Sequence, residues 1–161
     1  MENLQKKRAS TSIQNPKVGD YAEHFRKCKL GNSVLDVGCG DMNIKKYCPN
    51  PEYYYGLDAF PIIKGIISRP IEEYCPNIYG YETIVCFAAL DNVYNLKEAV
   101  RNMKRLCRRN IILLTGIGIP VDDYHTFEIT EQVLNGLMGQ EFKQSYREEL
   151  AQKIFLLEYS C

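Results

Sequence analysis

The chain has 161 residues, of which 45% are hydrophobic and 25% charged, and its formal net charge is zero. This length suits one domain with a substantial core, and the neutral balance disfavours a dedicated nucleic-acid-binding protein, which usually carries a basic excess. No apolar stretch approaches the length of a membrane span and the polar N-terminus lacks the hydrophobic centre of a signal peptide, so we expect a cytoplasmic protein.

The seven cysteines are an odd number, and none of them forms a Cys-x-x-Cys pair. Several lie within apolar runs, where a cysteine behaves as a small hydrophobic side chain. We therefore expect reduced thiols rather than a disulfide framework.

The N-terminal part of the chain divides into a tail and the start of the domain. Residues 1–15 are polar without helical periodicity, which predicts a mobile tail before a domain at 16–161. A helix is predicted from Pro16 to near Gly31 by the spacing of its apolar residues. These are Tyr21, Phe25, Cys28 and Leu30.

Two short apolar runs end in residues that suit a ligand. The run that begins at Val34 stops at Gly38, and Gly40 follows, so a buried strand ends in bare backbone. A second run ends at Asp58, about twenty positions after Asp36, where a doubly wound sheet places the acid that binds a ribose. The two βα turns together predict a cofactor that contains a nucleoside.

Charge at the first turn restricts the cofactor further. A dinucleotide site requires Gly-x-Gly-x-x-Gly, but Asn43 occupies the third position here, and Asp41 would repel a phosphate. Asp36 adds a second negative charge. Two carboxylates suit a positive ammonium or sulfonium group, and S-adenosylmethionine has both, together with a ribose for Asp58.

The same residues resemble a known family. Val34–Asp41 (VLDVGCGD) is similar to the first motif of class I S-adenosylmethionine-dependent methyltransferases, and Tyr55–Asp58 (YGLD) is similar to their second motif. The resemblance implies an α/β, Rossmann-like fold. Its sheet would be doubly wound and mostly parallel, with about seven strands and an antiparallel C-terminal strand, in a minimal single domain.

The resemblance also implies the cofactor contacts. Asp36, Gly38 and Gly40 would hold the methionine moiety, and Asp58 would accept both ribose hydroxyls. Tyr21 either faces the methionine end or only packs its helix. The full set of expected cofactor-binding residues is Tyr21, Asp36, Gly38, Cys39, Gly40, Asp58, Ala59, Phe87 and Ala88.

The middle of the chain predicts a shortened crossover. A short helix near Ile44 is cut off by prolines, and Ile66–Arg69 reads as the third strand, with no room for a full helix before it. Family members commonly contact adenine after this strand. Arg69 cannot accept a hydrogen bond from the adenine amino group, so either the backbone or Glu72 would have to accept it, and the adenine pocket is placed in this loop without an assigned contact.

The remaining elements follow the family order. Residues 83–88 and 111–115 read as central strands, and 96–107 as a helix with one apolar face. Its basic residues either contact phosphates or form a solvated face, and the lack of interleaved aromatic residues favours the latter. Asn110 is expected to take the left-handed conformation at the turn into the fifth strand. Thr130 is expected to cap a further helix, and 142–146 and 153–159 to pair as a hairpin.

Catalytic candidates lie on the loops after the fourth and fifth strands. Methyl transfer is an in-line displacement that needs neither a metal nor a covalent intermediate, but a base helps when the acceptor is a hydroxyl. His125 is the best candidate for that base, unless it is merely exposed or bonded to a neighbour. Weaker candidates are Asp91, Tyr94, Asp123 and Tyr124.

The acceptor is less defined than the cofactor. The short loops predict an open acceptor site or one that a second subunit completes. The signatures of two classes of DNA methyltransferase are missing, so a small molecule or a glycan is favoured over nucleic acid. A catalytically silent, methyltransferase-like binding or regulatory protein is the main alternative. A nicotinamide-dependent oxidoreductase is disfavoured by the missing third glycine.

Overall fold

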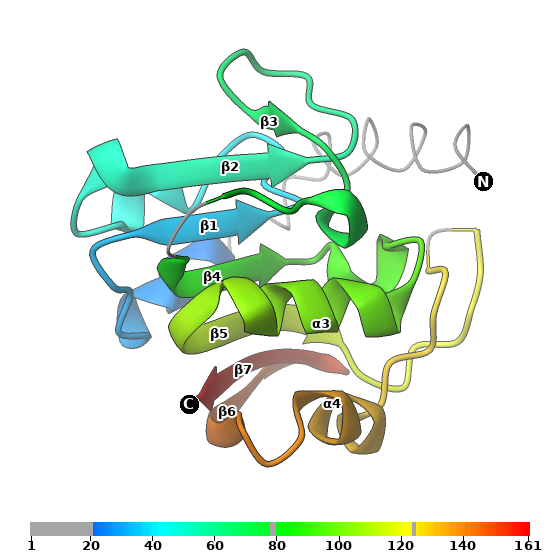
Figure 1. Cartoon of the computed structure of the whole chain (residues 1–161). Coiled ribbons are helices and arrows are strands. Elements are labelled where there is room, and N and C mark those ends of the chain that lie inside the picture. Colours follow the sequence, from blue (N-terminus) through cyan, green and yellow to red (C-terminus); the bar gives the residue numbers. More distant parts are fainter. Residues whose placement is uncertain (1–20, 78–79, 124) are drawn as a thin grey trace.

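A seven-stranded sheet forms the centre of the computed structural model, which describes residues 21–77, 80–123 and 125–161 (Figure 1). The strand order is β3-β2-β1-β4-β5-β7-β6. The strands are β1 Val34–Val37, β2 Tyr54–Asp58, β3 Ile67–Ser68, β4 Tyr81–Phe87, β5 Cys107–Gly116, β6 Lys143–Ala151 and β7 Ile154–Ser160. The first five strands pair in parallel, and β7 lies antiparallel between β5 and β6. The expected α/β architecture with an inserted C-terminal strand is confirmed.

The path of the chain creates a switch point beside β1. The chain moves outward from β1 through β2 to β3 and then returns to β4 on the other side of β1. Val37, at the end of β1, is paired with both Leu57 and Cys86. In an open α/β sheet, ligands bind beyond the carboxyl ends of the strands at such a point. The fold therefore places the two βα turns at the position where a ligand is expected.

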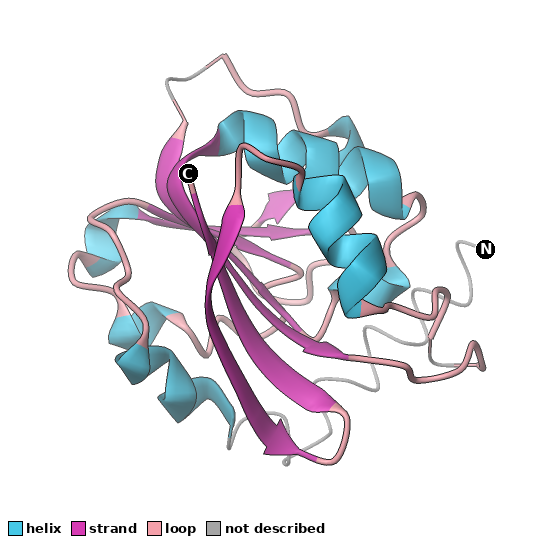
Figure 2. Ribbon diagram, turned by 90° about the horizontal axis from the view of Figure 1, so that it is seen from below, coloured by secondary structure: helices cyan, strands magenta, loops and turns pink. Residues whose placement is uncertain are grey.

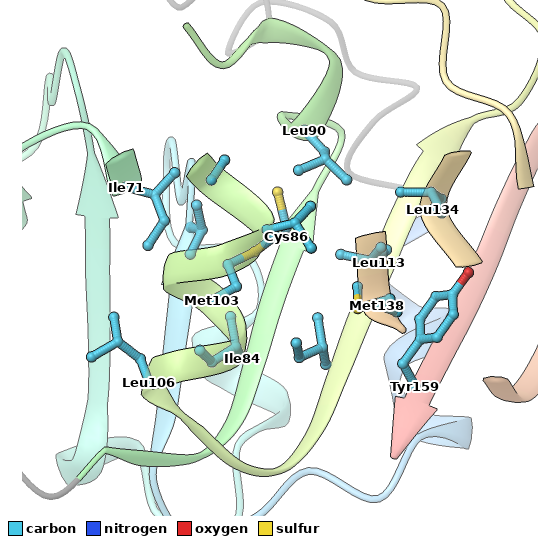
Figure 3. Close-up of a cluster of buried hydrophobic side chains, with 14 of the residues drawn as sticks. Ile71, Ile84, Cys86, Leu90, Met103, Leu106, Leu113, Leu134, Met138 and Tyr159 are labelled. Carbon is cyan, nitrogen blue, oxygen red and sulfur yellow. The ribbon is translucent and has the colours of Figure 1, made fainter. Parts of the chain in front are cut away.

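Two α-helices cover one face of the sheet (Figure 2). They are α3, Leu96–Leu106, and α4, Glu131–Met138. Figure 3 shows Met103 and Leu106 of α3 and Met138 of α4 among the buried side chains of β4, β5 and β7. The side chains of Asn95 and Thr130 accept backbone N–H groups of the first turn of these helices, so the predicted Thr130 cap is confirmed.

Short 3₁₀ helices cover the opposite face. They are η1 Ala22–Lys27, η2 Lys45–Tyr47 and η3 Pro51–Tyr53. Phe25 and Ile44 are buried against Val34 and Val85. The helix predicted from Pro16 to near Gly31 is too long at its C-terminal end, because η1 ends at Lys27 and Cys28 is already extended. Residues 1–20, which include the predicted tail, lie outside the described residues.

The connection from β2 to β3 contains no helix, as the sequence predicted. β3 has two residues and pairs only with Leu57 and Asp58. Two more 3₁₀ helices follow: η4 Ile71–Glu73 precedes β4, and η5 Leu90–Asn92 follows it. Within the described ranges, no helix has both the length and the apolar character needed to cross a membrane.

The expectation that Asn110 forms a left-handed turn is wrong. β5 begins at Cys107 directly after α3, and Asn110 is a buried residue of that strand. Its Oδ1 accepts the Thr83 hydroxyl at 2.6 Å, while its Nδ2 donates to Glu158 Oε1 at 2.9 Å and to the Lys29 carbonyl at 3.3 Å. The amide is stable in the sheet because it bridges β4, β5 and β7.

Replacing Asn110 by Ala should destabilise the fold by about 2–3 kcal/mol, because the substitution leaves the buried Thr83 hydroxyl without its acceptor. Chemical denaturation monitored by circular dichroism measures the change. The exposed Asn77 is a matched control, and Asn77→Ala should change the free energy of unfolding by less than about 0.5 kcal/mol. Equal effects of the two substitutions would contradict the bridging role.

Candidate functional site

The glycine turn after β1 is held by the end of β2. The amides of Gly38 and Cys39 donate to the Leu57 carbonyl at 2.8 and 3.2 Å, and the amide of Gly40 donates to Asp58 Oδ2 at 3.2 Å. Consecutive amides of this kind cradle a phosphate in nucleotide-binding loops. Here they are directed to β2. The helix that follows, η2, has only three residues, so neither feature of a pyrophosphate site is present in this part of the described chain.

Gly38 also contacts the end of β4. Its φ is +70°, and a Cβ at this position would lie 2.3 Å from the Cβ of Ala89. The neighbouring Ala88 has φ of +51°, a left-handed conformation that is costly for a residue with a side chain. Its amide donates to the Leu114 carbonyl at 2.8 Å, which holds this bend in place. The ends of β1, β4 and β5 are thereby fixed against each other.

Cys39 is a packing residue. Its side chain is buried, and burial strongly raises the pKa of its thiol. A Cβ at Gly56 would lie 2.8 Å from Cys39 Sγ, so the thiol occupies the space above this glycine of β2. A thiol in this environment is a poor nucleophile, and the backbone amide and carbonyl of Cys39 are bonded to Leu57 and Met42, so its role is structural.

Asp36 is a buried acid with one partner. It is 1% exposed, its Oδ2 accepts the Tyr54 hydroxyl at 2.5 Å, and no group in the described part of the chain bonds to its Oδ1. Burial raises the pKa of Asp36 to about 7, against the opposing effect of the Tyr54 hydrogen bond, and the carboxylates of Asp58 and Asp41 raise it further. The second negative charge expected at the turn is therefore only partly developed at neutral pH. Tyr54 was not recognised from the sequence, where it reads as one of three consecutive tyrosines.

Asp58 lies at the carboxyl end of β2 and is partly exposed. Its Oδ1 accepts the Phe60 amide at 2.8 Å, and its Oδ2 accepts the Gly40 amide at 3.2 Å. A carboxylate has about four acceptor positions, so these two bonds orient the group and leave capacity for two hydroxyls. Ala59 follows directly and is also partly exposed.

Phe87, Ala88 and Tyr21 lie on the other side of the switch point. The three residues pack against the same hydrophobic cluster below η1, and the Phe87 ring is 5.5 Å from the ring of Phe25. Each is partly buried. The described structure thus brings the expected cofactor residues to the carboxyl ends of β1, β2 and β4 and to the start of η1.

His125, on the loop after β5, lies next to Asp91, on the loop after β4. Its Nδ1 is 2.8 Å from Asp122 Oδ1, and its Nε2 is 3.5 Å from Asp91 Oδ2. The amides of Thr126 and Phe127 donate to the Asp91 carbonyl at 2.9 and 3.2 Å. Two of the predicted catalytic candidates, His125 and Asp91, are therefore adjacent. Asp122 was not predicted, although its position three residues before the histidine is a local signal.

The other catalytic candidates are placed differently. The amide of Tyr94 donates to Glu72 Oε1 at 2.5 Å, so its backbone is held toward η4. Asp123 is exposed, and Tyr124 lies outside the described residues. The sequence suggested Glu72 only as an alternative adenine contact, whereas in the structure it positions the loop after β4 and also accepts the Asn95 amide.

Three of the four basic side chains of α3 make contacts within the chain, and the fourth, Lys97, is exposed. Arg101 pairs with Glu98, Lys104 Nζ lies 2.7 Å from Glu141 Oε2, and Arg105 donates to the Tyr74 carbonyl at 3.2 Å. These contacts agree with a solvated structural face rather than a phosphate-binding surface.

Because Gly38 lies close to Ala89, replacing it by alanine should affect stability differently from replacing a glycine in open space. Gly38→Ala should destabilise the protein by about 2–4 kcal/mol, because the new methyl group overlaps Ala89 in a left-handed conformation. Gly136 in α4 has open space around it, so Gly136→Ala should be neutral or stabilise the protein by up to about 1 kcal/mol. Thermal and denaturant unfolding of the two variants measures the difference, and a neutral Gly38→Ala would contradict the contact.

No family model and no curated protein matches this sequence. Solved structures do match over most of the chain. A Burkholderia thailandensis 1,6-didemethyltoxoflavin-N1-methyltransferase with bound S-adenosylhomocysteine is 10% identical with a TM-score of 0.72, covering 99% of this chain and 88% of that one. A methyltransferase from Aquifex aeolicus, described as dependent on S-adenosylmethionine, is 11% identical with a TM-score of 0.73, covering 96% and 97%.

The magnesium protoporphyrin IX methyltransferase of Synechocystis PCC 6803, also with bound S-adenosylhomocysteine, is 13% identical with a TM-score of 0.63, covering 92% of this chain and 84% of that one. At such identities the likeness concerns the fold. The chain has the fold of the class I S-adenosylmethionine-dependent methyltransferases.

Proposed function

We propose that the protein is an S-adenosylmethionine-dependent methyltransferase that transfers the methyl group directly to its acceptor. The observation that carries the proposal is the first turn, whose three amides are directed to Leu57 and Asp58 while two carboxylates lie beside it. Such a site fits a nucleoside that carries a cation and no phosphate. The unpartnered, buried Asp36 Oδ1 is the kind of group that a bound cation would satisfy.

Different residues bind different parts of the cofactor. The cofactor supplies an electrophilic methyl group on a sulfonium when it is bound. Asp58 binds the ribose hydroxyls, oriented for this by the amides of Phe60 and Gly40. The turn from Gly38 to Gly40 allows close approach of the methionine part, with Asp36 providing negative charge. Phe87 and Ala88, with Tyr21 on η1, form the apolar side of the site and exclude water from it.

We propose His125 as the general base for an acceptor whose proton must leave. Asp122 orients the ring through Nδ1, and Asp91 Oδ2 lies 3.5 Å from Nε2. The Asp122 contact fixes the ring, so that Nε2 faces the loop after β4. Asp91 and Tyr94 remain alternative candidates for this role, since both belong to the loop after β4.

For the acceptor we propose a small molecule or a glycan rather than nucleic acid. The methyltransferases with similar structures include one named for 1,6-didemethyltoxoflavin, one for magnesium protoporphyrin IX and one described as an amino pentose methyltransferase. The internal ion pairs of α3 also argue against a phosphate surface. A second subunit that completes the short acceptor loops is part of this proposal. The free cysteines suit a reducing compartment, and we propose the cytoplasm.

A catalytically silent, methyltransferase-like binding protein is the alternative function. The exposed Arg69 directly after β3 favours it, because this side chain cannot accept a hydrogen bond from an adenine amino group. A nicotinamide-dependent oxidoreductase is less compatible with the site, since the amides that would bind its pyrophosphate are directed to β2.

Asp58→Asn should weaken S-adenosylhomocysteine binding by about a hundredfold or more, because two charge-assisted hydrogen bonds to the ribose are weakened. Isothermal titration calorimetry measures the affinity. Glu52→Gln is the matched control, since Glu52 is an exposed acid before the same strand, and it should bind as the unmodified protein does. Unchanged affinity in Asp58→Asn would show that the ribose site is misplaced, and a thermal shift with NAD alone would favour the oxidoreductase.

His125→Ala should lower kcat for methyl transfer by about a hundredfold or more and leave the affinity for S-adenosylhomocysteine unchanged. The assay follows label from methyl-labelled S-adenosylmethionine into a panel of hydroxyl and amine acceptors. Glu128→Gln is the control, because Glu128 is an exposed residue on the same loop as His125. Equal rates for His125→Ala and the unmodified protein would refute the base, and cofactor binding without transfer to any acceptor would favour the silent alternative.

A further inference from the structure

Asp36 and Tyr54 form a buried hydrogen-bonded pair, a feature that cofactor binding by itself does not require. The Tyr54 hydroxyl donates to Oδ2, while Oδ1 has no partner among residues 21–77, 80–123 and 125–161, and the side chain has almost no contact with solvent. A buried carboxylate that receives a single neutral donor is poorly compensated as an anion. Compared with an exposed carboxyl group, Asp36 therefore keeps its proton to higher pH.

The surroundings of Asp36 strengthen this preference. Other titratable and charged groups lie around Asp36 and Tyr54. Within the described residues, they come from the glycine turn, η2, β2 and β4. They are Cys39, Asp41, Lys45, Cys48, Asp58 and Cys86. The only cation among them is Lys45, whose Nζ lies 5.8 Å from the centre of the Tyr54 ring. Asp41 and Asp58 oppose ionisation of Asp36.

We infer that Tyr54 is a positioning residue that couples binding of the cationic cofactor to the loss of one proton from Asp36. The inference rests on the proposed function. Tyr54 holds Oδ2, so that Oδ1 is the atom that responds to the ligand. Arrival of the ammonium group, which S-adenosylmethionine and S-adenosylhomocysteine share, supplies the missing positive charge, Asp36 ionises, and its proton leaves to solvent. The O–H bond of the Asp36 carboxyl group breaks in this step, its electron pair stays on the carboxylate, and water or buffer takes up the proton.

The sign of the pH dependence follows from this order of events. Below the pKa of Asp36, which burial raises to about 7, binding must remove a proton, so affinity rises with pH. Above it the carboxylate is already ionised, and affinity becomes independent of pH. Loss of the Tyr54 hydroxyl removes the hydrogen bond that favours the anion, which moves this transition to higher pH.

The experiment is calorimetric titration with S-adenosylhomocysteine at pH 6 and pH 8 in buffers of different ionisation enthalpy, which counts the protons released. The unmodified protein should release close to one proton at pH 6 and almost none at pH 8. Tyr54→Phe should bind about tenfold more weakly at pH 7, recover affinity as the pH rises and still release protons at pH 8. Asp36→Asn should release none at either pH. The control is Tyr53→Phe, whose ring is 55% exposed, and it should behave as the unmodified protein does.

Two results would overturn the coupling while leaving the proposed function intact. One is tight binding by the unmodified protein without proton release at pH 6, a measurement that depends on no variant. The other is a Tyr54→Phe profile that overlays that of the unmodified protein. Failure of S-adenosylhomocysteine to bind at either pH would overturn the proposed function itself and the coupling with it.

Discussion

The hydrogen bonds between the glycine turn and the end of β2 determine the chemistry of the site. Gly38, Cys39 and Gly40 donate their amides to the Leu57 carbonyl and the Asp58 carboxylate. These bonds fix the distance between the two βα turns and orient Asp58. They also use the donors that would otherwise bind phosphate. A backbone arrangement that is compatible with a nucleoside thus becomes selective against a dinucleotide.

The same constraint extends to the rest of the sheet through close packing. Because Gly38 approaches Ala89 without a side chain between them, the exits of β1 and β4 lie together. The bend at Ala88 is tied to β5 by its bond to Leu114. The loop after β5 then returns to Asp91 through the amides of Thr126 and Phe127. The cofactor and acceptor sides of the site are therefore parts of one bonded framework.

Most of the fold could be predicted from the sequence, because the central strands are continuous apolar runs and the missing crossover helix leaves a visibly short connection. Long-range polar partners were not predictable. Asn110 reads as a turn residue, yet it lies in a strand because Thr83 and Glu158 reach it from elsewhere in the chain. Tyr54 reads as an apolar residue, and only the parallel pairing of β1 with β2 brings it to Asp36. The acids and glycines of the turn were identifiable because their spacing is local.

A crystal structure of the protein with S-adenosylhomocysteine tests the central claim most directly. The account predicts a ligand at the carboxyl ends of β1, β2 and β4, with both ribose hydroxyls on the Asp58 carboxylate and the amino group on the side of Asp36. The amides of Gly38 and Cys39 should keep their bonds to Leu57. A ligand bound elsewhere, or a turn that releases Leu57 and directs these amides to the ligand, would contradict it.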